Sequence, residues 1–239
     1  MAFDFWRRYL DGIPEYLARH YWWAYLSPRG VWFFDHAPII NLILFGQYRA
    51  ILNEVMHRYA TRESPRTLQL TCAYGALTPT LALSANTREL HVTDVAGIQL
   101  SSAESKLQAI SRSAKLARMN AESLAYASDS FDSVIIFFLL HELPGAARER
   151  TLNEAIRVLK PGGHLLIAEY GENRGIHWLH RCTPWRGFQE KIEPFLRDFW
   201  HSNLAEQIAG HAIRQGKPLQ AMAEVSLFDG FYRVLEYRV

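Results

Sequence analysis

The chain has 239 residues, 49% of them hydrophobic, and a formal net charge of +2. This length suits one domain with a sizeable core. The charge is too mild to indicate a nucleic-acid binder, since such proteins usually concentrate basic charge, and we expect no nucleic-acid partner. Two cysteines, Cys72 and Cys182, cannot build a disulfide framework, which favours a reducing compartment. Neither a secretory leader nor an apolar run of the ~20 residues that span a bilayer is apparent. We therefore expect a cytoplasmic protein that is soluble or bound to a membrane surface.

The first 48 residues hold 14 of the 31 aromatic side chains in the chain. Arg7, Arg8, Arg19 and Arg29 are interleaved with them. Aromatic rings beside guanidinium groups are typical of a membrane–water interface, although aromatic stripes also pack as helices over a core. We therefore expect residues 1–62 to form an aromatic-rich helical segment that acts as a lid, as a membrane-interface element, or as both.

From residue 67 onward, short apolar runs alternate with segments of helical spacing. The predicted strands are 67–73, 89–94, 130–138 and 164–170, and the predicted helices are 78–84, 102–117 and 146–159. Two further runs, 222–227 and 232–239, flank Asp229-Gly230 and predict an antiparallel hairpin. This order predicts an α/β domain over residues 63–239, with a mostly parallel sheet and helices on both faces.

Residues 176–210 of that domain are rich in Trp and Phe. Ligand sites are mostly apolar with a few polar groups. We expect this segment to form an apolar substrate cap, and the alternative is a helical cap that only stabilises the domain.

The turn after the first predicted strand is the most informative stretch of the chain. A nucleotide-binding α/β fold places a glycine-rich turn there, because glycine takes a positive φ and lets a ligand approach closely. This chain keeps Gly75 but has Thr71 and Ala73 where two glycines are expected, and the bulky Tyr74 directly precedes Gly75. We expect a ligand to lie differently against such a turn.

Four motifs in a fixed order make residues 65–170 resemble class I S-adenosylmethionine-dependent methyltransferases of the ubiquinone and menaquinone type. The strings 120–124, 128–132 and 157–163 are similar to loops of that family, and Asp94 ends the second strand, where an acid accepts hydrogen bonds from ribose hydroxyls. Taken alone, Asp94 also fits a surface acid at a strand end. The resemblance implies a Rossmann-like class I methyltransferase fold with a mostly parallel seven-stranded sheet and S-adenosylmethionine as cofactor. The residues that it assigns to the cofactor are Gln69, Cys72, Ala73, Tyr74, Gly75, Asp94, Val95, Asn120, Ala121, Glu122 and Phe138.

A second resemblance covers most of the chain. Segments 21–25 (YWWAY), 41–46, 72–75 and 137–142 resemble the RquA family of rhodoquinone biosynthesis proteins. That resemblance implies conversion of ubiquinone to rhodoquinone, in which an amino group donated by S-adenosylmethionine replaces a ring methoxy group and manganese (Mn2+) is required. It also implies a peripheral protein that collects its ubiquinone substrate at the cytoplasmic face of the inner membrane.

Tyr74, His141 and Glu142 are the predicted catalytic residues. Tyr74 would turn the amine of the cofactor toward the acceptor, and His141 and Glu142 follow a strand at the edge where open α/β sheets bind ligands. A neutral imidazole serves as a base or a metal ligand, and carboxylates suit Mn2+, so His141, Glu142 and Glu169 are candidate metal ligands. The alternatives are that Tyr74 only fills space and that the others cap a strand or face solvent.

Three functions remain open on the sequence. The first is amino transfer to ubiquinone, and the second is an S-adenosylmethionine-dependent C- or O-methyltransferase acting on a prenylated quinone or phenol. The glycine-poor turn speaks against the second. The third is a binding or scaffold protein without turnover. No motif sets the oligomeric state or the length of the prenyl tail.

Overall fold

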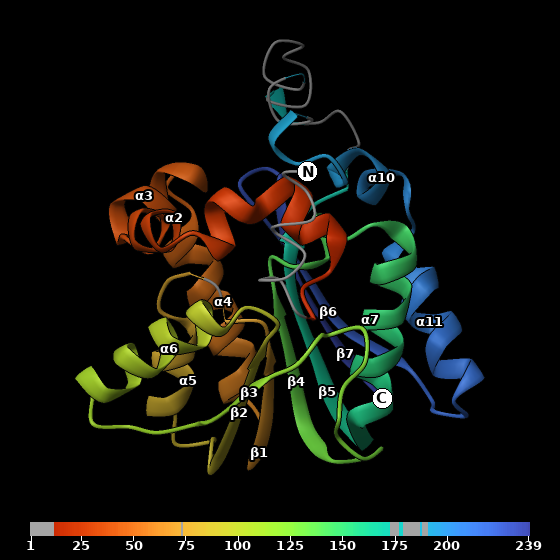
Figure 1. Ribbon diagram of the computed structural model, residues 1–239. Helices are drawn as coiled ribbons and strands as arrows, with labels where there is room; N and C mark the ends of the chain where they lie inside the picture. Colours follow the sequence, from red (N-terminus) through yellow and green to blue (C-terminus); the bar gives the residue numbers. More distant parts are fainter. Residues whose placement is uncertain (1–11, 73, 173–176, 179–186, 188–190) are drawn as a thin grey trace.

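The computed structural model describes residues 12–72, 74–172, 177–178, 187 and 191–239. In this part of the chain, seven strands form one sheet in the order β3-β2-β1-β4-β5-β7-β6. Strands β1 to β5 pair in parallel, β7 runs antiparallel to β5, and β6 runs antiparallel to β7 (Figure 1). The predicted sheet with its closing hairpin is therefore confirmed. The strands are β1 (Arg66–Leu70), β2 (Glu89–Asp94), β3 (Lys115–Arg118), β4 (Phe131–Phe137), β5 (Leu159–Tyr170), β6 (Gln220–Leu227) and β7 (Tyr232–Arg238).

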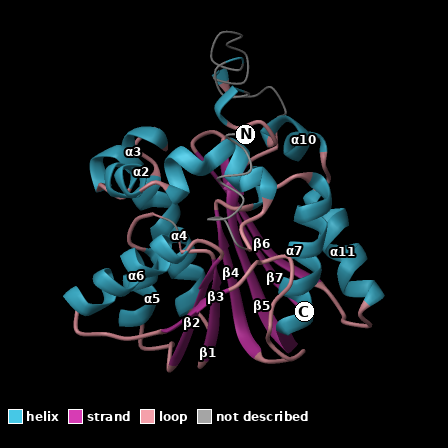
Figure 2. Cartoon of the chain, viewed as in Figure 1, coloured by secondary structure: helices cyan, strands magenta, loops and turns pink. Residues whose placement is uncertain are grey.

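Helices cover both faces of this sheet (Figure 2). On one face, α4 (Tyr48–Ala60) packs against β5 and β7, and α5 (Leu77–Leu83) lies between α4 and α6 (Gly97–Ala109). On the other face, α7 (Gly145–Val158) packs against α11 (Leu204–Arg214). With both faces covered, a central strand reads as a continuous apolar run, and Val134, Ile135 and Ile136 of β4 are fully buried.

The N-terminal helices lie over the carboxyl edge of the parallel strands, at the red and orange end of the chain in Figure 1. They are η1 (Leu17–Leu26), which has π-helical hydrogen bonding, α2 (Pro28–Phe34) and α3 (Ala37–Ile43). The short helices η2 (Leu140–Glu142) and α10 (Leu196–His201) contact one another at the same edge. Within the described ranges, no helix is both long and apolar enough to cross a bilayer.

Two predicted boundaries are wrong because single residues turn the backbone. The helix predicted over 102–117 ends at Ala109, since Ser111 has φ 53° and the chain then enters β3 beside β2. The first strand ends at Leu70 rather than at residue 73, because Thr71 has φ 63°. A β-branched residue is strained in this left-handed region. The position where a glycine was expected therefore has the backbone of a glycine.

A third boundary differs because of pairing. Strand β5 begins at Leu159 rather than at residue 164, since Leu159 pairs with Phe131 and the Gly162 N–H donates to the Val239 carbonyl oxygen. The division into segments 1–62 and 63–239 stays a prediction. Of the predicted cap over 176–210, only residues 177–178, 187 and 191–210 belong to the described chain.

Candidate active site

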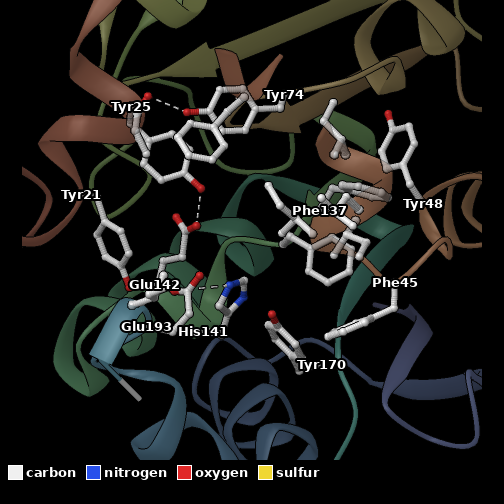
Figure 3. Close-up of a pocket in the computed structure, with 18 of the residues that line it drawn as sticks. Tyr21, Tyr25, Phe45, Tyr48, Tyr74, Phe137, His141, Glu142, Tyr170 and Glu193 are labelled. Carbon is white, nitrogen blue, oxygen red and sulfur yellow. Dashed lines mark hydrogen bonds and ion pairs between the residues drawn. The ribbon is translucent and has the colours of Figure 1, made fainter. Parts of the chain in front are cut away.

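A cavity of about 690 Å³ lies at the carboxyl edge of the parallel strands. Its walls come mainly from η1, α2, α3 and the ends of β4 and β5, and they are largely aromatic and aliphatic. Its volume falls within the ~300–1,000 Å³ typical of small-molecule sites. Figure 3 shows Phe45 and Phe137 in one part of the wall, while His141, Glu142 and Glu193 gather elsewhere. The cavity suits an apolar ligand that carries a polar group.

Tyr74 forms part of the wall of this larger cavity. Its ring stacks on the Tyr25 ring, with centroids 5.2 Å apart and planes 15° apart. Its hydroxyl donates to the Ala24 carbonyl oxygen at 2.6 Å. Burial raises the pKa of Tyr74 above its ordinary value, so the phenol stays protonated and remains a donor. The predicted catalytic Tyr74 is thus fixed to η1.

The turn that contains Gly75 is bound to the N-terminal helices. Gly75 has φ 88°, and a Cβ there would lie 2.2 Å from Tyr48 Oη, so a side chain does not fit. The Gly75 N–H donates to Asp35 Oδ1 at 2.9 Å, and the Ala76 N–H donates to Tyr48 Oη at 2.5 Å. Lys106 Nζ donates to Asp35 Oδ1 and to the Gly75 carbonyl oxygen. In related folds, the backbone amides of this turn bind a ligand. Here the amides of Gly75 and Ala76 donate to side chains of the protein itself.

Asp94 lies at the end of β2, as predicted. Its Oδ2 accepts the Cys72 N–H at 3.1 Å, and its Oδ1 accepts the Ala96 N–H at 2.9 Å. Burial raises the pKa of Asp94 to about 6 even though these hydrogen bonds lower it. A second cavity of about 60 Å³ lies beside Asp94. Four further predicted cofactor residues line it together with Asp94, namely Val95, Asn120, Ala121 and Phe138.

Side chains of the N-terminal segment form part of the wall of this second cavity. Tyr16, Tyr21 and Tyr25 are part of its lining, and Tyr16 Oη donates to Glu122 Oε1 at 2.9 Å. A volume of about 60 Å³ is well below the ~300 Å³ at which small-molecule sites begin. A nucleoside-sized ligand beside Asp94 therefore requires that these tyrosines move outward.

Four further predicted cofactor residues, Gln69, Cys72, Gly75 and Glu122, lie outside both cavity linings. Gln69 Oε1 accepts from Thr78 Oγ1 at 2.9 Å, and its Nε2 donates to the Thr71 carbonyl oxygen at 3.0 Å, so Gln69 braces the turn. Burial raises the pKa of the Cys72 thiol. Glu122 accepts hydrogen bonds from Tyr16 and Arg150. Ala73 lies outside the described residues.

His141 and Glu142, which the sequence places after β4, meet a third side chain in the larger cavity. His141 Nδ1 lies 2.8 Å from Glu169 Oε2, and His141 Nε2 lies 3.9 Å from Glu193 Oε2. Tyr25 Oη donates to Glu142, and Tyr21 Oη donates to Glu193 at 3.1 Å. One ligand atom each from His141, Glu142 and Glu193 lies within 4.8 Å of the others. An imidazole with two carboxylates is a donor set that fits Mn2+ among other divalent cations.

Glu169, the third predicted metal ligand, has a different place. Besides His141 Nδ1, its carboxylate accepts the backbone N–H groups of Leu140 at 2.6 Å and His141 at 3.3 Å. It is fully buried, so it orients His141 from behind. The third member of the cluster, Glu193, was missed by the sequence reasoning. In the sequence it follows Glu190 and Lys191 closely and precedes Arg197 and Asp198, so no motif spacing distinguishes it from an ordinary surface acid.

Burial and mutual charge set the protonation of this cluster. Burial by itself lowers the pKa of His141, but the charge of Glu169 and the bond to it raise that pKa to about 9. Burial, followed by the charge of Glu193, raises the pKa of Glu142, and burial also raises that of Glu193. Burial thus favours the protonated forms of Glu142 and Glu193.

Residues 67–163 match the family described as "Methyltransferase domain". The ubiquinone/menaquinone biosynthesis C-methyltransferase UbiE of Proteus mirabilis is 30% identical over 135 residues, which cover 55% of this chain and 53% of the relative. The phthiotriol/phenolphthiotriol dimycocerosates methyltransferase of Mycobacterium leprae is 33% identical over 147 residues, covering 58% and 52%. The chain thus spans about half the length of the curated relatives it matches.

Solved structures share the fold at low identity. The N-methyltransferase NodS of Bradyrhizobium japonicum, in complex with S-adenosyl-l-homocysteine, has a TM-score of 0.57 at 17% identity and covers 90% of this chain and 98% of its own. The PH0226 protein of Pyrococcus horikoshii has a TM-score of 0.60 at 14% identity, with 95% and 99% covered. The [4+2]-cyclase SpnF has a TM-score of 0.51 at 19% identity, with 79% of each chain covered. The chain therefore has the Rossmann-like methyltransferase fold.

Proposed function

We propose that the protein is an S-adenosylmethionine-dependent transferase whose acceptor is a quinone or phenol with an apolar tail, because residues 67–163 match a methyltransferase-domain family and the similar curated proteins are named as methyltransferases. The cofactor would lie beside Asp94, and the acceptor would fill the larger cavity. One observation carries this proposal: four residues, Tyr21, Tyr25, Phe138 and Glu142, line both cavities. A cofactor in the smaller cavity would therefore face an acceptor in the larger one.

Methyl transfer to a ring carbon or oxygen is the chemistry that the curated relatives favour, since both are named as methyltransferases. Such an acceptor loses a proton as it gains the methyl group, so a base near the acceptor accelerates transfer. Glu142 and His141 lie in the wall of the acceptor cavity. Glu169 fixes the His141 ring through Nδ1, which leaves Nε2 toward the cavity. We assign the proton transfer to this pair.

Amino transfer to ubiquinone is the second candidate, and the turn favours it. The amides of Gly75 and Ala76 are engaged by Asp35 and Tyr48, so the methionyl end of the cofactor loses an anchor. An α-amine with a pKa near 8 is a nucleophile once deprotonated. Its attack on a ring carbon that bears methoxy would form a carbon–nitrogen bond and release methanol. The bond between this nitrogen and the α-carbon of the donor would then break by elimination, which leaves the amino group on the ring. The fold itself does not restrict the chemistry to methyl transfer, since the cyclase SpnF shares it.

Manganese belongs to this second candidate, through the resemblance to the RquA family. A divalent cation supplies Lewis-acid activation of a carbonyl when it is bound. His141, Glu142 and Glu193 would hold it, since their donor atoms already converge. In both candidates the aromatic wall of the larger cavity would exclude water from the reacting ring.

We also propose that the N-terminal helices bind a membrane surface. Between Leu17 and Arg49 the sole acid in the sequence is Asp35, whose carboxylate pairs with Lys106. Three arginines on this segment, Arg19, Arg29 and Arg49, are exposed, and each adds about 1 kcal/mol of attraction to an anionic lipid surface. Six large apolar side chains are exposed beside them, namely Trp22, Trp23, Trp32, Phe33, Leu42 and Ile43.

The position of this face relative to the larger cavity supports the same proposal. Trp23, Leu42 and Ile43 are exposed and also line the cavity, so the cavity reaches the surface within the apolar face. Aromatic and aliphatic side chains at headgroup depth would let a lipid-soluble quinone pass from the bilayer into the protein. The finding that no described helix spans a bilayer is compatible with such surface binding.

Mass spectrometry of the quinone product tests the proposed function. The purified full chain is incubated in parallel with ubiquinone and with its demethylated phenolic precursors in anionic vesicles, with Mn2+, and with S-adenosylmethionine that carries heavy nitrogen at the amine and deuterium at the methyl group. A quinone or phenol that gains the deuterated methyl group supports methyl transfer. A product that has lost methoxy and carries heavy nitrogen supports amino transfer. If neither ubiquinone nor its demethylated phenolic precursors yield a labelled product, the proposal is overturned.

A further inference from the structure

Three tyrosines of the N-terminal segment each donate a hydrogen bond to a carboxyl group of the rest of the chain. The bonded pairs are Tyr16 with Glu122, Tyr21 with Glu193, and Tyr25 with Glu142. Figure 3 shows Tyr21 and Tyr25 with their hydroxyls toward Glu193 and Glu142. Burial raises the pKa of all three phenols, so they stay protonated and remain donors. These residues, which we call the latch tyrosines, all line the smaller cavity beside Asp94.

The π-helical bonding of η1 is what brings the latch tyrosines to one side of the helix. A π-helix closes its hydrogen bonds over five residues, as the Ser27 N–H does with the Trp22 carbonyl oxygen, so residues five apart lie close to the same side. In an α-helix, at about 100° per residue, Tyr21 would lie about 140° and Tyr25 about 180° around the axis from Tyr16. Such bonding is mostly limited to single turns, often at functional sites, whereas η1 extends over 10 residues. A change from π to α bonding would therefore break the three bonds together.

The opposite side of η1 faces solvent. Trp22 is 53% exposed and Trp23 is 38% exposed, although they stand between the buried Tyr21 and Ala24 in the sequence. The buried and the exposed side chains belong to one helix, so neither set moves alone. A rotation that withdraws the latch tyrosines from the acids also turns the two indoles.

Withdrawal of η1 would expose apolar surface that the closed structure covers. The helix supplies Tyr21, Ala24 and Tyr25 to the wall of the larger cavity, and Phe138 lines both cavities behind it. In water, exposure of these groups costs free energy in proportion to their apolar area. At a lipid surface the cost is smaller, because apolar side chains enter the boundary between headgroups and acyl chains. Lipid thus binds the open state more tightly than the closed state, and only such a difference shifts a conformational equilibrium.

We propose that η1 is a latch that closes the cofactor site in the absence of lipid, and that an anionic bilayer surface releases it. The latch rests on the proposed function, because the ligand that it excludes is the cofactor beside Asp94. By thermodynamic linkage, lipid raises the affinity for the cofactor, and the cofactor raises the affinity for lipid by the same factor. Group transfer is then confined to protein that is bound where an apolar acceptor is dissolved.

Calorimetric titration of the full chain with S-adenosylhomocysteine tests the latch. The titration is done with and without vesicles of phosphatidylethanolamine and phosphatidylglycerol. We expect the vesicles to tighten binding at least threefold, and S-adenosylhomocysteine to strengthen co-sedimentation with the vesicles by the same factor. The triple variant Tyr16→Phe, Tyr21→Phe, Tyr25→Phe keeps the rings and removes the three hydroxyls. Without vesicles it should bind at least threefold more tightly than the unaltered chain, and vesicles should change its affinity less.

Tyr126→Phe is the matched control, because it removes a tyrosine hydroxyl that lies 3.1 Å from His91 Nδ1 on β2 and bonds no acid under η1. This variant should respond to vesicles as the unaltered chain does. The latch is overturned if vesicles do not tighten binding by the unaltered chain, or if the triple variant folds and binds with unchanged affinity. An absence of binding in every condition overturns the latch together with the cofactor site. Tighter binding with vesicles, but no transfer of a labelled group, would overturn the proposed function and leave the latch.

Discussion

Asp35 Oδ1 accepts the Gly75 N–H at 2.9 Å, so a carboxylate from the N-terminal helices is bound to the turn that follows β1. Lys106 Nζ bonds the same oxygen at 2.5 Å, and Ser102 donates to Asp35 Oδ2. Together these groups form an anion site that is filled by a side chain of the protein. Any cofactor carboxylate must compete with Asp35 for it or bind elsewhere.

Asp35→Asn tests this competition. The substitution removes the charge while keeping a carbonyl oxygen for Gly75, so Lys106 becomes available to a ligand carboxylate. We expect S-adenosylhomocysteine to bind about three- to tenfold more tightly, and the free energy of unfolding to fall by about 1–2 kcal/mol. Calorimetric titration and urea unfolding measure the two effects. Ser102→Ala, which leaves the charge in place, should bind as before. Weaker binding by Asp35→Asn would show that the carboxylate helps to hold the ligand.

Substitutions of Tyr74 separate its hydroxyl from its ring. Tyr74→Phe keeps the stack on Tyr25 and loses the hydrogen bond to the Ala24 carbonyl oxygen, which should cost about 1 kcal/mol of stability. Tyr74→Ala also removes the ring and should cost about 3–5 kcal/mol. If Tyr74 directs the cofactor, Tyr74→Phe should retain labelled transfer and Tyr74→Ala should lose it. Urea unfolding together with product mass spectrometry measures both. Full transfer by a folded Tyr74→Ala would leave the ring with a space-filling role alone.

The pH dependence of cofactor binding follows from Asp94. Burial raises the pKa of Asp94 from 3.8 to about 6, so in the ligand-free protein the carboxylate becomes protonated as the pH falls below about 6. If the ionised form accepts the ribose hydroxyls, affinity for S-adenosylhomocysteine should be about tenfold lower at pH 5 than at pH 7.5. Calorimetry at the two pH values measures this change, and Asp94→Asn should bind weakly and equally at both. An unaltered chain whose affinity is the same at both pH values would contradict the assignment.

The raised pKa of Asp94 affects folding stability in the opposite direction: ligand affinity should rise with pH, whereas the contribution of Asp94 to the free energy of unfolding should fall. Between pH 3.8 and about 6 the folded chain binds more protons at Asp94 than the unfolded chain does. The contribution of Asp94 to the free energy of unfolding therefore decreases as the pH rises through this window. It stays at its lowest value above about pH 6. Asp94→Asn should remove this part of the pH dependence of urea unfolding.

Binding to lipid should depend on the exposed apolar face of the N-terminal helices. Trp32 is 68% exposed and Leu42 is 74% exposed, so replacing both by Ser should leave the fold intact. We expect at least a tenfold loss of co-sedimentation with anionic vesicles. Arg29→Glu should weaken binding at low salt more than at high salt, because the attraction is screened. Ile213→Ser on α11, also at a highly exposed apolar residue, is the control. Equal sedimentation of all variants would exclude this face as the lipid-binding surface.

The sequence by itself determined the architecture and one part of the site. Buried apolar runs such as that of β4 and the order of the motifs specify a parallel sheet, because periodicity and turn residues act locally. The same local logic places Asp94 and His141 at strand ends, on the edge where ligands bind. The sequence pattern predicted the wrong ends for the first strand and for the helix over 102–117. Each of these elements ends early because one residue, Thr71 or Ser111, has left-handed backbone angles.

Only the tertiary structure decided which side chains meet. Glu193 lies 52 positions after His141 in the chain, and no periodicity links them, yet their side chains converge in one cavity. The position of Glu169 behind the imidazole, and the bond of Asp35 to Gly75, likewise depend on how the N-terminal helices and the loops close over the sheet. Such contacts join segments far apart in sequence. They are set by the packing and charge of the whole fold, which no local pattern of residues records.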